Sequence, residues 1–177
     1  MGTKLKNWIK IIIGVLLLAL LLFALLQNKS TSFNKVSFDD NNQIYNRTEN
    51  LFLDTITHAG LHSLNIKNTA VLIAPIQITE IENDLELKGY ITQTDGGYII
   101  FIKNTDKQES ITIISHELIH LNQLISKRLI NRDSAIIFDN VKYNIKSIPE
   151  YNKRPWEIEA FSNQHILEGK IIDILYN

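Results

Sequence analysis

Residues 116–120 are His116-Glu117-Leu118-Ile119-His120, an H-E-x-x-H sequence, and this stretch decides which fold and chemistry we expect. In an α-helix, side chains four residues apart lie on one face, so the two imidazoles can bind the same divalent metal ion. Glu117 lies beside them, where it can take a proton from a metal-bound water. The motif predicts a metallohydrolase. The alternative interpretation is a surface helix with two histidines and an ordinary carboxylate.

The sequence around the motif predicts an amphipathic helix over about residues 110–130. Ser110 can serve as its N-cap. Apolar residues recur at intervals of three and four and form one stripe that should be buried: Ile111, Ile114, Leu118, Leu121 and Ile125. Both histidines lie off this stripe, so we expect a ligand to reach them.

A third ligand is expected further along the chain, because catalytic zinc usually has three protein ligands and a water. The segment Arg154-Pro155-Trp156-Glu157-Ile158-Glu159 offers two carboxylates two residues apart, which point to different sides of a helix. Pro155 suits the first helical position, which puts Glu157 third, where a carboxylate can accept from free backbone N–H groups. Glu157 is therefore predicted to be structural and Glu159 to be the metal ligand. Asn163, one turn later, could hydrogen-bond the non-coordinating nitrogen of a ligating histidine.

These two motifs together resemble the gluzincin group of zinc metallopeptidases, whose second helix carries a Glu-Ala-x-Ser-Asp pattern. This chain has Glu159-Ala160-Phe161-Ser162-Asn163, with Asn in place of Asp. The resemblance is to the compact, "minigluzincin" type and implies an α+β, zincin-like fold. A small antiparallel or mixed sheet would pack on the H-E-x-x-H helix and on a second ligand helix. His116, His120 and Glu159 would hold Zn²⁺, and Asn163 would orient a zinc-bound histidine.

The activity that the resemblance implies is peptide hydrolysis, so a peptide or protein is the expected substrate. Zinc would polarise the substrate carbonyl, and Glu117 would pass a proton from water to the leaving amine. Tyr143, Tyr151 or His165 could help to stabilise the oxyanion, although a tyrosine in such a place is more often simply half-buried packing. One rival is a tethered binding or assembly protein with this fold and little or no turnover, which the Asn163 departure favours. Another is an anchored structural protein with an accidental motif.

The N-terminal end has the pattern of a signal anchor. Residues 11–26 are uncharged and apolar, and Lys4, Lys6 and Lys10 precede them. No small-x-small cleavage site follows, so we predict an uncleaved transmembrane helix over residues 1–27. The lysines place the N-terminus in the cytoplasm and the domain in the periplasm or outside the cell. The alternative, a buried core helix, would require a domain able to cover every face of this segment.

The rest of the chain is predicted to be a linker, residues 28–41, followed by one domain, residues 42–177. A net charge of −1 in 177 residues gives no nucleic-acid-binding signature, and no cysteine is available for a disulfide. The sequence carries no signal for the oligomeric state.

The expected elements of the domain begin with a helix over residues 42–61 and strands over 69–79, 87–94 and 98–103. Asp95-Gly96-Gly97 would turn the last two strands into a hairpin. The resemblance makes 98–103 the edge strand that holds a peptide by strand addition, unless it is an ordinary exposed hairpin. A second hairpin, 135–138 and 141–145, should turn at Asp139-Asn140. His58 and His62 are predicted to be structural.

Overall fold

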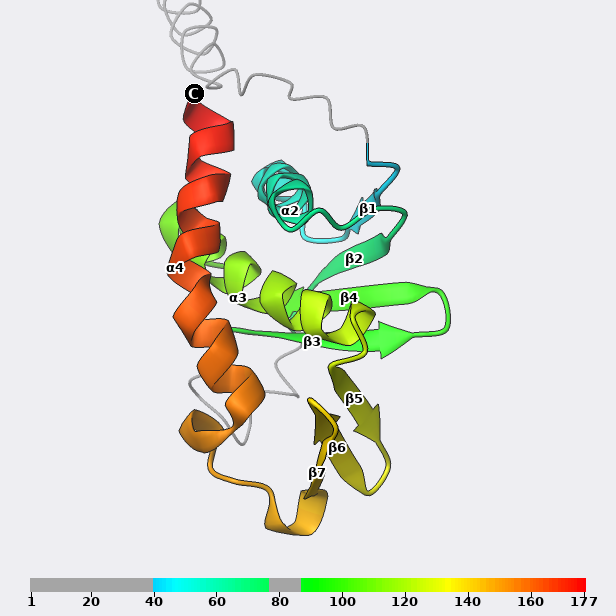
Figure 1. Ribbon diagram of the computed structural model, residues 1–177. Helices are drawn as coiled ribbons and strands as arrows, with labels where there is room; N and C mark the ends of the chain where they lie inside the picture. The colour runs from blue at the N-terminus through cyan, green and yellow to red at the C-terminus, as the bar shows by residue number, and fades with distance from the viewer. Residues whose placement is uncertain (1–39, 77–86) are drawn as a thin grey trace, which may run out of the picture. The chain divides into compact units, whose positions relative to one another are not determined.

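The computed structural model describes residues 40–76 and 87–177, and over these ranges the protein has an α+β fold, as predicted (Figure 1). In chain order the elements are β1 (Gln43–Asn46), α2 (Leu51–Ser63), β2 (Ala70–Pro75), β3 (Gly89–Thr94), β4 (Gly97–Ile102), α3 (Lys107–Ile125), β5 (Leu129–Arg132), β6 (Ala135–Phe138), β7 (Val141–Asn144), the 3₁₀ turns Ile145–Ser147 and Tyr151–Lys153, and α4 (Pro155–Tyr176).

The larger sheet in the described residues is mixed, with the strand order β1-β2-β4-β3. β1 and β4 run parallel to β2, and β3 runs antiparallel to β4. Side chains alternate between the two faces of a strand, and the face toward the helices carries buried residues such as Val71, Ile73 and Ile100. This sheet supplies the floor on which the helices pack.

The prediction that residues 98–103 form an edge strand was wrong. The hairpin over Asp95–Gly97 is present, but β4 also pairs with β2 on its other side, so β4 is internal. In the sheet as described, β3 is the edge strand on the side of α3. Hydrophobic alternation shows that a strand exists, whereas parallel pairing with a distant strand depends on tertiary packing.

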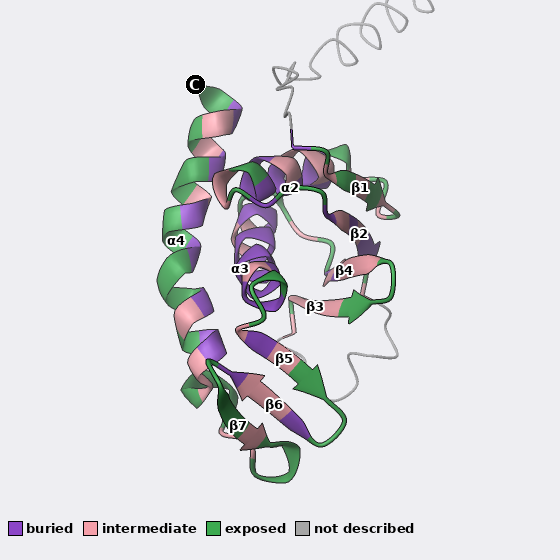
Figure 2. Cartoon of the chain, turned by 45° about the vertical axis from the view of Figure 1, so that its right-hand side comes forward, coloured by how far each residue is buried: buried purple, intermediate pink, exposed green. Residues whose placement is uncertain are grey.

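The helices lie on one side of this sheet, with α2 and α3 next to the strands and α4 packed against both helices (Figure 1). α3 is therefore covered on nearly all sides, and Figure 2 shows it almost wholly buried. The sequence predicted one buried stripe, with both histidines accessible. The histidine face is buried as well, because α4 covers it.

A separate three-stranded sheet in the described part of the chain, β5-β6-β7, follows α3. Its second hairpin turns at Asp139 and Asn140, as predicted, and both residues have positive φ, 48° and 67°. One face of this sheet contributes Leu129 and Phe138 to a cluster with Leu124 and Trp156. This cluster fixes the start of α4, since Trp156 is its second residue.

The predicted helix over residues 42–61 was wrong in its first half. Residues 43–46 form β1, and α2 begins at Leu51 with Asn50 as its N-cap, where the side chain accepts from the Phe52 N–H. Asn46 accepts a hydrogen bond from the Thr48 N–H, a local side-chain contact that competes with helix formation.

Three predicted boundaries also move. Asp106 is the N-cap of α3 in place of Ser110, so the helix starts one turn earlier. It ends at Ile125, and the last two residues of the predicted helix, 129 and 130, belong to β5. Asp40, placed in the predicted linker, is buried and accepts hydrogen bonds from the Asn42 and Asn68 N–H groups. The folded domain therefore includes the end of that segment.

The predicted membrane anchor, residues 1–27, lies outside the residues that the structure describes. Of the helices that are described, none has the length and apolar character needed to cross a membrane.

Candidate metal centre

The side chains of His116, His120 and Glu157 meet in the interior between α3 and the first turn of α4. Glu157 Oε2 lies 3.3 Å from His116 Nε2 and 3.1 Å from His120 Nε2, and the two Nε2 atoms are 3.1 Å apart. All three residues are buried. Bond lengths of about 2.0–2.1 Å in a tetrahedral zinc site place ligand atoms about 3.3–3.4 Å apart. The spacing of these three atoms therefore suits three corners of such a site. We call this group the His-His-Glu cluster.

The structure does not bring Glu159 to the histidines, so its prediction as the third ligand is corrected to Glu157. The Glu159 carboxylate accepts from Arg128 at 2.8 and 2.6 Å and from the Gln123 amide at 3.2 Å. Pro155 begins α4 as predicted, but the face of α4 that packs on α3 is the one that carries Glu157. The phase of α4, that is, which of its faces meets α3, decides between the two carboxylates.

A periodic signal in α4 could have identified Glu157. The buried residues of α4 recur at intervals of three and four along one stripe: Trp156, Glu157, Ala160, Gln164, Leu167, Ile171 and Leu175. Glu157 belongs to this stripe and Glu159 does not. A carboxylate on the buried face of a helix requires a partner of opposite charge or a metal ion.

The far side of each imidazole contacts a glutamine that sequence reasoning missed. His120 Nδ1 lies 2.9 Å from Gln123 Oε1, and His116 Nδ1 lies 3.2 Å from Gln164 Oε1. Asn163, predicted for such a role, instead donates from Nδ2 to the Glu159 backbone carbonyl and is exposed. The expected contact exists, but other residues make it.

Glu117 is buried beside the cluster, as the motif predicts, and is only 4% exposed. Burial raises the pKa of Glu117 to about 7, with the charge of Glu157 adding to the rise and both histidines opposing it. A Cβ atom at Gly89 would lie 3.3 Å from Glu117 Oε1. The carboxylate therefore lies against the edge strand β3, at a position where the strand has no side chain.

The charges of the cluster favour a cation. Burial alone would raise the pKa of Glu157, but its close contacts with His116 and His120 outweigh burial and hold that pKa well below its usual value. Burial opposes protonation of His120, yet Glu157 and Glu117 raise its pKa. The site therefore keeps an anionic carboxylate and attracts positive charge.

The two predicted tyrosines lie in different surroundings. Tyr151 hydrogen-bonds Glu157, and burial together with that carboxylate raises the pKa of the Tyr151 hydroxyl. The ring of Tyr143 packs edge-on against Trp156 at 5.4 Å, so Tyr143 has the packing role that was its alternative. His165 is exposed and approaches Glu168 at 3.4 Å, so it does not fold over the cluster.

Two half-exposed aromatic rings border the cluster. The ring of Phe161 lies 4.6 Å from the ring of His116, and Tyr151 meets Phe161 edge-to-face at 6.1 Å. These rings separate the buried histidine from solvent on this side.

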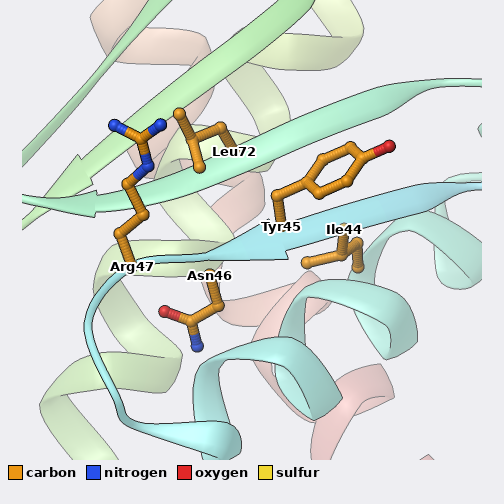
Figure 3. A pocket seen from close by; sticks show the side chains of 5 residues that line it. All are labelled: Ile44, Tyr45, Asn46, Arg47 and Leu72. Atoms are coloured by element: carbon orange, nitrogen blue, oxygen red, sulfur yellow. The ribbon is translucent and has the colours of Figure 1, made fainter.

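Two surface hollows lie elsewhere on the domain. One lies on β1 and β2, where Tyr45 and Leu72 point to one side of the sheet and Ile44 to the side of α2 (Figure 3). The other lies between α3 and α4 and is bordered by Arg128 and Glu159. Neither is lined by the His-His-Glu cluster, which remains, within residues 40–76 and 87–177, the one group of three or more potential ligands with suitable spacing.

No family model, characterised protein or solved structure matches this chain. The resemblance to gluzincins therefore depends on the H-E-x-x-H motif and on the geometry of the cluster. The second motif no longer supports it, because the carboxylate at the cluster is Glu157, and residues 157–161, Glu-Ile-Glu-Ala-Phe, do not fit the Glu-Ala-x-Ser-Asp pattern.

Proposed function

We propose that this protein is a zinc-dependent metallopeptidase in which His116, His120 and Glu157 bind Zn²⁺. The observation that carries the proposal is the approach of these three ligand atoms to within 3.1–3.3 Å of one another, with the buried Glu117 alongside. Two imidazoles and one carboxylate are a ligand set of catalytic zinc sites, which leave a fourth position for water. Calcium and magnesium prefer oxygen ligands, so two imidazoles argue against them.

The proposed reaction is hydrolysis of a peptide bond. Zinc, when bound, would polarise the substrate carbonyl and lower the pKa of a water molecule. The Glu117 carboxylate takes a proton from that water and delivers it to the nitrogen of the leaving amine. A pKa of about 7 suits a group that both accepts and donates a proton near neutral pH.

Tyr151 is the candidate for stabilising the oxyanion. Its hydroxyl is close enough to Glu157 for that carboxylate to raise its pKa, and its ring packs beside Phe161. A hydroxyl at this position could turn from the carboxylate to a carbonyl oxygen on which negative charge develops. The ring of Tyr143 packs against Trp156, so Tyr143 is not a second candidate for this role.

The cellular setting is part of the same proposal. We propose that residues 1–27 anchor the protein in the cell membrane, with the peptidase domain in the periplasm or outside the cell, where it would meet peptide or protein substrates. The rival function, a tethered binding protein without turnover, loses its main support because Asn163 does not contact the cluster.

The test uses the full chain, loaded with zinc, and the variant Glu117→Gln. We expect about one zinc per chain in both proteins, measured by mass spectrometry of the metal, because Glu117 is not a ligand. Cleavage of a peptide library should fall by about 10²–10⁴-fold in the variant, the usual contribution of a general base.

Glu150→Gln is the matched control, since Glu150 is exposed and pairs with Lys153. It should behave as the wild type does. Undiminished cleavage by Glu117→Gln, or a wild type without zinc, would refute the proposed function. Zinc without any cleavage in the wild type would favour the binding protein.

A further inference from the structure

The orientation of the Gln123 side chain is determined by its neighbours. Its Nε2 lies 3.1 Å from the Trp156 carbonyl oxygen and 3.2 Å from Glu159 Oε1. A backbone carbonyl oxygen can only accept hydrogen bonds, and so can an ionised carboxylate. The amide nitrogen of Gln123 therefore has to face these two oxygens. The Arg128 guanidinium donates to both oxygens of Glu159, at 2.8 and 2.6 Å, so this carboxylate is held as an acceptor toward Gln123. The Gln123 carbonyl oxygen then faces His120 Nδ1, and this nitrogen has to donate.

Gln164 repeats the same arrangement on the other histidine. Its Nε2 donates to Glu168 Oε1 at 2.8 Å, and its Oε1 lies 3.2 Å from His116 Nδ1. Both glutamines are buried, at 1% and 7% exposure, so water does not readily replace these contacts. Each histidine thus meets an amide oxygen whose amide nitrogen is fixed by a carboxylate.

We propose that these two chains of contacts, His120-Gln123-Glu159 and His116-Gln164-Glu168, are positioning relays that keep both imidazoles in the Nδ1–H tautomer. This inference rests on the proposed zinc site. In that tautomer each Nε2 carries a lone pair, and both Nε2 atoms lie within 3.1–3.3 Å of Glu157 Oε2. Neither ring then offers a proton to Glu157, and three facing lone-pair atoms favour a cation, so the relays prepare the cluster to bind metal.

The choice of glutamine has an electrostatic reason. Two carboxyl groups are already buried here, Glu157 in the cluster and Glu117 beside it. A carboxylate on Nδ1 of each histidine would add two more negative charges around one divalent ion. An amide oxygen orients the ring without adding charge to the buried site. The carboxylates, Glu159 and Glu168, contact the glutamine amides and not the histidines.

The relay through Gln123 extends to the second sheet. Arg128 binds Glu159 and also contacts Asp139 in the β6–β7 turn, with two contacts of 2.7 Å. Glu159 is thus held in place by an arginine that is itself fixed by the hairpin. Glu159 and Arg128 are positioning residues that act on His120 through Gln123.

The test measures zinc affinity of the full chain by competition with a chelator at fixed pH. Gln123→Leu and Gln164→Leu should each weaken zinc binding by about 10–100-fold, the usual effect of losing an outer partner of a ligating histidine. Gln108→Leu is the matched control, because Gln108 lies exposed on the same helix as Gln123. Its zinc affinity should be unchanged.

A second readout does not need metal. ¹⁵N NMR of the histidine rings in the metal-free protein, at a pH where they are neutral, reports which nitrogen carries the proton. We expect Nδ1–H for His116 and His120 in the wild type and loss of that preference for the histidine whose glutamine is replaced. Glu168→Ala and Glu159→Ala remove the carboxylates that hold the glutamine amides, and each should weaken zinc binding several-fold. These variants keep the test decisive if a leucine variant fails to fold.

Unchanged zinc affinity in the folded variants, or Nε2–H as the wild-type tautomer, would overturn the relays. A wild type that does not bind zinc would instead overturn the proposed function, and the NMR measurement would still decide about the relays. The two failures are therefore distinguishable.

Discussion

Replacing Glu117 with Gln should stabilise the metal-free protein in a pH-dependent manner. The carboxyl group has an ordinary pKa of 4.5, and burial in the folded protein raises it to about 7. Between these two pH values the folded state binds more protons than the unfolded state, so stability falls as the pH rises. The difference between the two pKa values corresponds to about 3 kcal/mol once the pH exceeds 7. Gln has nearly the same shape and no charge, so the variant avoids this cost.

The assay is urea unfolding of the metal-free full chain, followed by circular dichroism in the presence of a chelator. At pH 8 the free energy of unfolding of Glu117→Gln should exceed that of the wild type by about 3 kcal/mol, and at pH 4.5 the two should be close. Glu150→Gln, an exposed residue paired with Lys153, should show no such trend. A variant that is less stable at pH 8, or a difference that does not change with pH, would contradict the argument that burial of this carboxyl group raises its pKa.

Three further predictions concern the ligand assignment and helix packing. Glu157→Ala should lose stoichiometric zinc, whereas Glu159→Ala should still bind one zinc at saturation; the reverse pattern in metal analysis would restore Glu159 as the ligand. Gly60→Ala should lower the free energy of unfolding by about 1–3 kcal/mol, because a Cβ there would overlap a buried leucine of α3. Gly169→Ala, on the exposed face of α4 with no described atom within 4 Å of its Cβ position, should raise it by about 0.5–1 kcal/mol in the same denaturation assay, and equal effects at both glycines would refute the packing argument. Asn50→Ala removes the N-cap of α2 and should cost about 1 kcal/mol, whereas an unchanged unfolding midpoint would show that the cap contributes nothing.

Much of the domain follows from local sequence. The 3.6-residue period of α3, the Asp-Gly-Gly turn between β3 and β4, and Pro155 at the start of α4 are local signals, and the structure confirms each of them. The helical motif also brings His116 and His120 together, since four residues of helix are sufficient for that. Local geometry is encoded within a few residues.

The features that were predicted wrongly depend on contacts between distant segments. β4 is internal because β2 pairs with it, and no sequence pattern within β4 predicts that pairing. Glu157 is at the cluster because α4 docks on α3 with one particular face. Glu159 is not a free carboxylate, because it pairs with Arg128, which precedes the β5–β7 sheet in the chain and which no local pattern around Glu159 indicates.

The position of Glu157 also affects how α3 and α4 are held together. Glu157 lies 37 positions after His120, and a chain without cysteines has no covalent bond to tie such distant segments. An ion shared by α3 and α4 would serve as a cross-link. For a disulfide that closes a loop of this length, the lost entropy of the unfolded chain corresponds to about 4 kcal/mol of stability. Chelation would then remove this cross-link at the Pro155 end of α4, where the packing of Trp156 remains, and leave the far end, where Leu175 is buried, unchanged.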